Sequence, residues 1–257
     1  MTGYENYEAV ASNTLKKDKA LSFVKVFSII SVLLIFGTGI FSEILGIVFD
    51  GYHVEIIKYY LQDLFDFFLF ALPVIILLIY LFVFFNKGKG NWLLAISFGT
   101  MGLASFIFAI RAITNLIKNT QFNDAYFEYF PTTAIFRLYV NPALDILFNL
   151  AVVCFSVFYI VNCVSKFKLA KITRIVTGLH LVLAILYALS ENLLRLINLI
   201  DESYMIFSGI LTKLSWCIWE LTCVLPVIIY FVFWGIVIKR IKKEKELLQN
   251  QGTVVIQ

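Results

Sequence analysis

Residues 67–85 of this chain read FFLFALPVIILLIYLFVFF, a run that contains no charged side chain and only one polar side chain, Tyr80. A helix needs about 20 consecutive apolar residues to cross the roughly 30 Å hydrocarbon core of a bilayer. A run of this length and character is therefore typical of a transmembrane helix. It indicates that the chain is an integral membrane protein.

Five further segments share this character, so we predict an all-α polytopic membrane protein with six transmembrane helices. The other segments are Leu21–Phe49, Trp92–Ile117, Ala143–Val164, Ile172–Ile200 and Leu214–Ile238. The composition agrees, because 61% of the residues are hydrophobic and 15% are charged, whereas soluble domains carry about 25% charged residues. We divide the chain into an N-terminal tail, a transmembrane domain and a basic C-terminal tail, over residues 1–20, 21–238 and 239–257.

The distribution of charge among the connections predicts the orientation of the chain. Most of the 21 basic residues lie in the two tails and in the second and fourth connections. Lysine and arginine accumulate on the cytoplasmic side of membrane proteins, so we expect both termini in the cytosol and the spans as three in-out-in hairpins. The membrane is expected to be the plasma membrane or an endomembrane. The basic residues suit anionic lipid headgroups, and no nucleic-acid partner is expected.

Every predicted span has a charged residue near or directly beside its outer end. Counted at about 1.5 Å per helical residue, these residues lie roughly 30 Å from the inner face and form a belt near the outer interface. The six residues are Glu43, Asp66, Arg111, Asp145, Glu191 and Glu220. One interpretation is structural, because charged side chains at span ends reach the headgroup region at little cost. It applies best to Asp66, Asp145 and Glu43.

The alternative hypothesis is a ligand-binding or ion-pair network. Glu191 and Arg195 are spaced i, i+4, which favours an ion pair on one helix face. Arg111 has small or apolar neighbours in the sequence, and we expect Glu220 or Glu43 to be its counter-ion. Buried charges in lipid need partners, and the network would either bind a polar ligand from outside or lock the helices together. The candidate site comprises Arg111, Glu191, Arg195, Glu220, Glu43 and Asp66.

Deeper in the spans the sequence offers few functional candidates. His180 is the one ionisable candidate near the midplane, and a proton relay is one interpretation of it. A lone histidine on a helix is more often a hydrogen-bonded structural residue. Pro73 and Pro226 are expected to weaken or kink their spans, because proline removes a backbone donor. Trp216 and Trp219 are expected in an interfacial aromatic belt.

Two outer connections and the C-terminal tail have patterns of their own. Residues 50–66 place apolar side chains on one helix face, which predicts a helix that lies on the outer leaflet or extends the second span. Residues 119–141 are rich in aromatic side chains and are predicted to form a lid over an outer vestibule or an interfacial flap. Residues 238–248 are expected to prolong the sixth span as a solvated helix.

The sequence argues against a resident catalytic or nucleotide-binding domain. It has no glycine-rich phosphate loop, and the connections at residues 86–91 and 165–171 are too short to hold such a domain. The four cysteines all fall within spans, without the spacing of a metal site or a disulfide framework. We therefore expect no cofactor and no metal. Transport driven by ATP would need a partner ATPase subunit, and the sequence leaves the oligomeric state open.

Three functional classes fit these features. Six spans, a charged outer vestibule and similar sequences in the three hairpins favour a permease, a channel or a membrane subunit of a transport system. The apolar midplane favours a non-catalytic scaffold, sensor, immunity or assembly protein. The third class is an intramembrane enzyme. Glu191 and Arg195 resemble part of the Glu-Glu-x-x-x-Arg signature of membrane-embedded CAAX-type proteases, but Ser190 occupies the first acidic position and no histidine pair follows. No family and no catalytic residue are therefore assigned.

Cysteine labelling tests the predicted orientation. In a variant whose four native cysteines are replaced by serine, a single cysteine is introduced in place of Gly88 or Tyr204. With sealed vesicles of known orientation, we expect a membrane-impermeant maleimide to label the two positions from opposite sides, since basic loops face the cytosol. Labelling of both positions from the same compartment would contradict the prediction.

Overall fold

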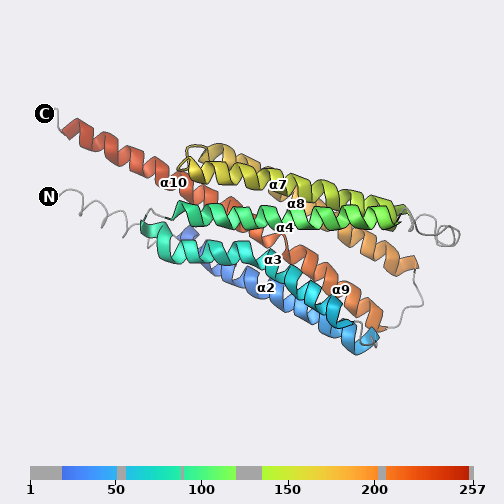
Figure 1. The fold of residues 1–257 in the computed structure, drawn as a ribbon. Coiled ribbons are helices and arrows are strands. Elements are labelled where there is room, and N and C mark those ends of the chain that lie inside the picture. The colour runs from blue at the N-terminus through green and yellow to red at the C-terminus, as the bar shows by residue number, and fades with distance from the viewer. Residues whose placement is uncertain (1–18, 51–55, 88–89, 120–134, 202–206, 255–257) are drawn as a thin grey trace.

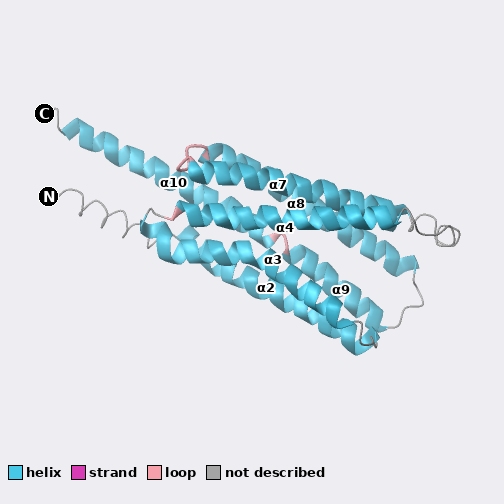
Figure 2. Cartoon of the chain, viewed as in Figure 1, coloured by secondary structure: helices cyan, strands magenta, loops and turns pink. Residues whose placement is uncertain are grey.

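The computed structural model describes residues 19–50, 56–87, 90–119, 135–201 and 207–254. At several helix ends the backbone is described but the side chains are not, and Glu43 and Arg195 are among these residues. The regular structure of the described part is helical, and six of its helices are long and apolar enough to cross a membrane (Figures 1 and 2). The prediction of an all-α chain with six candidate membrane spans is thereby confirmed.

The helices follow one another in the order of the predicted spans, and three spans are divided into more than one element. Spans one, three and five are single helices, whereas span two ends in irregular helix, span four begins in it, and span six is broken. The elements are α2 Lys19–Asp50, α3 Ile56–Ile79, the π-helix η1 Tyr80–Phe84, the 3-10 helix η2 Phe85–Lys87, α4 Asn91–Asn119, the π-helix η3 Phe136–Val140, α7 Asn141–Val164, α8 Ala170–Asp201, α9 Phe207–Thr222 and α10 Leu225–Val254.

Two helices extend well beyond the predicted spans. α3 begins at Ile56. The segment before span two, which was expected either to lie on the outer leaflet or to extend the span, therefore extends the span from Ile56 onward. α10 continues to Val254, and the basic C-terminal segment therefore prolongs span six as a helix, as predicted. Residues 120–134, which hold most of the predicted aromatic lid or flap, lie outside the described residues.

The six spans pack as three consecutive pairs that close into a ring. α2 packs on α3, α4 on α7, and α8 on both halves of span six. The pairs meet where α3 packs on α4, where α7 packs on α8, and where α9 and α10 return to α2. α2 begins and α10 ends at the same end of the bundle (Figure 1). We call this the tail end, and the other the far end.

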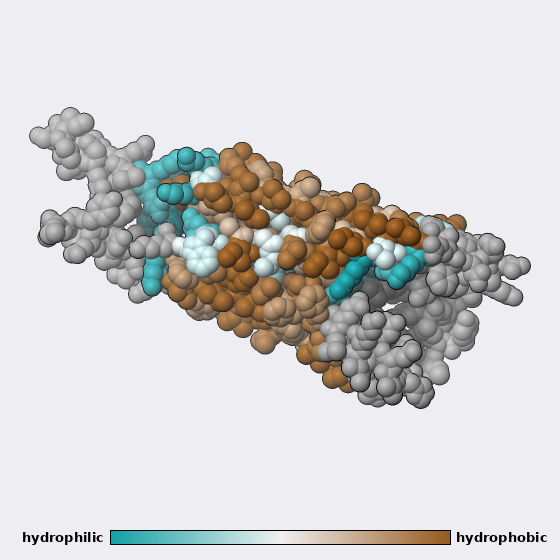
Figure 3. Space-filling model, in the orientation of Figure 1, coloured by the Kyte–Doolittle hydropathy of each residue, from teal (hydrophilic) through white to brown (hydrophobic). Residues whose placement is uncertain are grey.

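The outer surface of the ring is apolar, as contact with lipid requires. Large side chains such as Leu33, Val164 and Ile175 are exposed, and the visible face carries a hydrophobic band between hydrophilic residues near its two ends (Figure 3). In water so large an exposed apolar area would favour aggregation or binding to a partner. In a bilayer it is the surface that faces the hydrocarbon chains.

Aromatic side chains fill the half of the bundle near the tail end. Tyr230, Phe233 and Trp234 of α10 are fully buried. Phe98 of α4 lies 5.0 Å from Tyr230 and 5.8 Å from Trp234 between ring centroids, and Tyr159 of α7 lies 4.8 Å from Phe98. We call these five residues the aromatic cluster. Because the cluster joins three helices, α10 acts as the central packing element of this half.

Span two departs from the predicted α-helix at the tail end and not at its proline. α3 runs through Pro73 without interruption, and the Pro73 carbonyl accepts a hydrogen bond from Ser97 Oγ at 2.7 Å. After α3 the chain continues as the π-helix η1, which has more residues per turn than an α-helix, and then as the 3-10 helix η2, which has fewer. Arg240 Nη1 of α10 donates to the Phe85 carbonyl of η2 at 2.5 Å, and its guanidinium carbon lies 5.3 Å from the centre of the Phe85 ring. This contact joins spans two and six.

Span six is broken near its middle, where the sequence predicted a kink. α9 ends at Thr222 and α10 begins at Leu225. Pro226 has no backbone N–H to donate to the Thr222 carbonyl, so the regular α-helical ladder cannot continue. At the break the Val224 N–H donates to the Leu221 carbonyl at 3.2 Å, an i→i−3 bond of a turn. The predicted effect of Pro226 is confirmed, whereas Pro73 causes no comparable break.

Close packing of α4 against α7 depends on a glycine. A Cβ atom added at Gly102 would lie 2.9 Å from the Cβ of Ser156, a distance that requires the two backbones to separate. Gly37 on α2 has no neighbouring atom within 4 Å of such a Cβ. Small residues allow transmembrane helices to approach closely, because dispersion contacts rather than hydrophobicity hold helices together in lipid.

Replacement of these two glycines by alanine tests this packing. We expect Gly102→Ala to lower the thermal unfolding midpoint of the purified protein, since forced separation of packed elements costs about 1–3 kcal/mol. Gly37→Ala is the matched control, and it is expected to be neutral or slightly stabilising because alanine is the better helix former. Equal midpoints for the two variants in detergent would show that α4 and α7 do not meet at Gly102.

Candidate functional site

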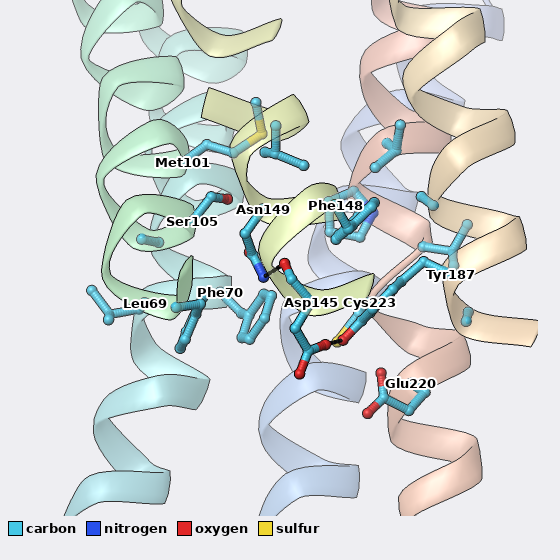
Figure 4. Close-up of a pocket in the computed structure, with 18 of the residues that line it drawn as sticks. Leu69, Phe70, Met101, Ser105, Asp145, Phe148, Asn149, Tyr187, Glu220 and Cys223 are labelled. Carbon is cyan, nitrogen blue, oxygen red and sulfur yellow. Dashed lines mark hydrogen bonds between the residues drawn. The ribbon is translucent and has the colours of Figure 1, made fainter. Parts of the chain in front are cut away.

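A cavity of about 340 Å³ lies between α3, α4, α7, α8, α9 and α10. Tyr230 of the aromatic cluster belongs to its wall, and so do Cys223, Val224 and Pro226 at the break in span six. The cavity therefore occupies the space where the broken span passes its neighbours. Figure 4 shows side chains from several of these helices that converge on it.

An ion pair between α3 and α4 forms part of the cavity wall. Arg111 Nη1 lies 2.5 Å from Asp66 Oδ1 and 2.6 Å from Asp66 Oδ2. The sequence pattern predicted Glu220 or Glu43 as the counter-ion of Arg111, and the pair with Asp66 corrects that prediction. Because α3 packs directly on α4, the side chains of Asp66 and Arg111 are close enough to form this ion pair. Asp66 was assigned to the headgroup region by its position near a span end, but it also lines the cavity.

A second polar contact joins α7 to α8. The Tyr187 hydroxyl donates a hydrogen bond to Asp145 Oδ1, and the Tyr187 ring stacks on Phe148 with centroids 4.4 Å apart. Asn149 Nδ2 donates to the Asp145 backbone carbonyl at 2.9 Å. Glu220 of α9 lies beside this pair at the same end of the cavity (Figure 4). Oxygen atoms from three helices therefore gather at one end of the cavity.

Aromatic side chains form much of the remaining wall. Phe70 of α3 stacks on Phe108 of α4 with ring centroids 4.8 Å apart. The Phe70 ring is nearly perpendicular to the Trp219 ring, with ring centroids 5.4 Å apart. Trp219 was predicted to lie in an aromatic belt at the membrane interface. In the structure Trp219 is buried, with 8% of its surface exposed, because the turn of α9 directs it at Phe67 and Phe70. The side chain of Trp216 lies outside the described residues.

The wall nearer the aromatic cluster is polar but carries no carboxylate among the described residues. His180 of α8 is 2% exposed, and its Nδ1 lies 3.3 Å from the Tyr159 hydroxyl. Ser105 and Asn149 also line the cavity, together with apolar residues such as Met101 and Val152. A buried histidine with a hydroxyl partner fits the structural interpretation, and its position on the cavity also fits a relay, so the relay role of His180 stays a prediction.

The candidate residues of the network thus separate into three groups. Asp66, Arg111 and Glu220 line one cavity. Glu191 is buried on α8, with 5% of its surface exposed, but it does not belong to the cavity wall. The side chains of Glu43 and Arg195 lie outside the described residues. In the described part of the chain, no group of three or more His, Cys, Asp or Glu side chains is arranged to hold a metal ion.

Sequence reasoning missed Tyr187, although a signal for it exists. His180, Ala184, Tyr187, Ala188 and Glu191 recur at positions i, i+4, i+7, i+8 and i+11, the spacing of one helix face. The face is buried, with Tyr187 only partly exposed. A polar stripe of this kind on an otherwise apolar span indicates the side that faces the bundle interior.

A double-mutant cycle tests the ion pair of α3 and α4. We expect Asp66→Asn and Arg111→Gln each to lower the unfolding midpoint, since each leaves an uncompensated charge, and the double variant to lose less than the sum. The expected coupling is roughly 0.5–3 kcal/mol. The control pair is Lys242 and Glu246, which lie 3.8 Å apart with exposed side chains, and it should couple by about 0–1 kcal/mol. Additive effects for Asp66 and Arg111 would contradict the pair.

Comparisons with known proteins add no assignment. No protein-family model, no curated protein and no solved structure matches this chain.

Proposed function

We propose that this multi-pass membrane protein is a transport protein, namely a permease, a channel or a membrane subunit of a transport system, and that the cavity receives its substrate. The observation that carries the proposal is the gathering of Asp66, Arg111, Asp145 and Glu220 around one cavity inside an apolar bundle. Ionisable side chains in spans are costly, and where they occur they typically mark the path of an ion or a substrate.

The broken sixth span supports this proposal. Transport proteins commonly form their substrate sites at discontinuous helices, where the irregular backbone lines a cavity. Here α9 ends at Thr222 and α10 begins at Leu225, and residues on both sides of that break, Cys223 and Pro226 among them, belong to the cavity wall. The break is also a point about which the two halves of span six can move relative to each other.

The position of the aromatic cluster indicates the end of the cavity from which a substrate enters. The cluster lies on the tail-end side of the cavity, where Tyr230 and Trp234 of α10 pack on Phe98 of α4. Passage toward the tail end requires α10 to separate from α4, and the hydrogen bond from Arg240 to the Phe85 carbonyl must follow that movement. Under this proposal the far end of the cavity faces the substrate first, and α10 is the moving element.

A non-catalytic scaffold, sensor, immunity or assembly protein is the second candidate. The observation that favours it is the aromatic cluster, whose five residues are fully buried. A half-bundle packed in this way forms a rigid support, and in a scaffold the ion pair of Asp66 and Arg111 would serve only to hold α3 against α4. The two candidates predict different effects of removing a cavity carboxylate. A transport protein would lose flux, whereas a scaffold would lose only stability or the binding of a partner.

Flux measurements on the purified protein in liposomes test the proposal. Uptake of labelled choline, glutamate and glucose, and fluxes of Na⁺ and K⁺, are compared for the wild type, Glu220→Gln and Glu246→Gln. We expect at least one solute to enter faster than into empty liposomes. Glu220→Gln should abolish that flux, and Glu246→Gln should retain it because Glu246 is exposed on the prolonged part of α10.

The scaffold gives a different result in the same experiment. In that case no solute enters faster with the wild-type protein than without it, and Glu220→Gln lowers only the unfolding midpoint or the binding of a partner protein. Recovery of the variants is compared by size-exclusion chromatography, so that a misfolded protein is not counted as an inactive one.

A further inference from the structure

We propose that the outer surface between α8 and α10 near the tail end binds the phosphate group of an anionic phospholipid, with Arg174 as the central contact. This inference goes beyond the proposed transport function and does not depend on it. Four features carry it, namely the depth of Arg174 in its span, the way its guanidinium is held, the charges around it and the apolar surface beside it.

The first feature is the depth of Arg174. The candidate span Ala170–Leu193 has 24 residues, so as a helix it is about 36 Å long. This length exceeds the roughly 30 Å of a hydrocarbon core, and the ends of the span therefore reach the headgroup region. Arg174 lies four residues after Ala170, about 6 Å along the helix. Its long side chain can thus place the guanidinium at the depth of the lipid phosphates.

The second feature is the way the guanidinium is held against α10. Its carbon lies 4.9 Å from the centre of the Phe231 ring and 3.5 Å from the position that a Cβ atom would take at Gly235. A side chain larger than alanine at Gly235 would therefore displace it. The Phe231 ring also lies against Gly178 of α8, where an added Cβ would be 3.4 Å away. Contacts that position the guanidinium before a ligand binds lower the entropic cost of binding.

The third feature is the excess of positive charge on this surface. Arg174 is exposed, and it forms no ion pair with a described carboxylate. The carboxylates described on the prolonged part of α10 are Glu244 and Glu246, and both contact basic residues of α10. Lys171 of α8 and Lys239 of α10 are exposed about one turn nearer the tail end, and they too form no ion pair with a described carboxylate. The surface therefore attracts anions.

A lipid phosphate fits these three cationic side chains. The planar guanidinium of Arg174 presents parallel N–H donors that match two phosphate oxygens, and a lysine acts as a point charge beside such a group. A lipid with a net negative headgroup, such as phosphatidylglycerol, compensates the excess charge. Phosphatidylcholine brings its own ammonium group, and this surface offers that group no described carboxylate. We therefore expect the site to prefer the anionic lipid.

The fourth feature favours a lipid over a soluble phosphate compound. Ile175, Leu179 and Val182 of α8 are 74%, 53% and 52% exposed, and their i, i+4, i+7 spacing places them on one face of the helix. This apolar stripe begins beside Arg174 and runs into the span. The acyl chains of a lipid whose phosphate contacts Arg174 can lie along the stripe. A soluble phosphate compound would gain nothing from it.

Thermal unfolding of the full-length protein in mixed micelles tests the lipid class. Phosphatidylglycerol, phosphatidylcholine and diacylglycerol with the same acyl chains are added to one detergent at equal mole fraction, and inorganic phosphate is added separately at equal ionic strength. We expect phosphatidylglycerol to raise the unfolding midpoint by more than about 2 °C above the other three, because a ligand that binds the folded state stabilises it. Native mass spectrometry then counts the lipids that the folded protein retains.

Variants locate the site. Arg174→Gln should weaken phosphatidylglycerol binding about tenfold, since hydrogen bonds between charged groups are among the stronger ones in proteins. Lys245→Gln is the matched control, because Lys245 is exposed and basic but lies further along the prolonged α10, and it should bind as the wild type does. Gly235→Leu keeps every charge and occupies the place of the guanidinium, so it should also weaken binding. Gly235→Ala adds only an ordinary contact and should not.

The possible outcomes separate the lipid, its source and its site. Equal midpoints with phosphatidylcholine and phosphatidylglycerol would overturn the preference for an anionic lipid. An equal rise with inorganic phosphate would show that a soluble anion suffices and would overturn the lipid source. Equal losses in Arg174→Gln and Lys245→Gln would indicate general attraction of basic residues to an anionic micelle and would overturn the site. Because mass spectrometry reads the folded protein, a variant of lower stability still reports its binding.

Discussion

The free-energy cost of an ionisable side chain in hydrocarbon is the constraint on which the arrangement of this protein depends. Lipid cannot solvate a carboxylate or a guanidinium, so such groups must find each other or water inside the bundle. The apolar faces of the spans point outward to lipid, and Asp66, Arg111, Asp145 and Glu220 point to a common interior. The cavity and the orientation of the five spans around it both follow from this one requirement.

The half of the bundle near the tail end is packed differently. Near the tail end the aromatic rings of α4, α7 and α10 pack to full burial, and Arg240 of α10 donates a hydrogen bond to the Phe85 carbonyl. Span six belongs to both halves, with α9 at the polar cavity and α10 in the aromatic cluster. Pro226 interrupts the helix between them, so α9 and α10 are two separate helices. The bundle therefore has a cavity lined by carboxylates in one half and a buried aromatic cluster in the other.

Particular residues show which features of the structure the sequence pattern predicts and which it does not. The six apolar runs identified the spans because the thickness of hydrocarbon sets the length of any helix that crosses it. The prolonged α10 and the irregularity at Pro226 were also predicted, but the same signal at Pro73 produced no break in α3, so the missing N–H of proline does not decide by itself where a span breaks. The partner of Arg111 was not predictable, and Trp219 was assigned to the wrong surroundings. Both depend on which helices are neighbours and on how each is rotated about its axis, and a one-dimensional pattern contains neither quantity.

The sequence by itself determined that this chain has six candidate membrane spans and that its charged side chains recur at span ends. These properties follow from hydrophobicity and length, which are local. Only the tertiary structure decided that Asp66 pairs with Arg111, that Tyr187 holds Asp145, and that these groups share one cavity with Glu220. Such contacts join residues far apart in the chain, and they form only when packing fixes the order and rotation of the helices.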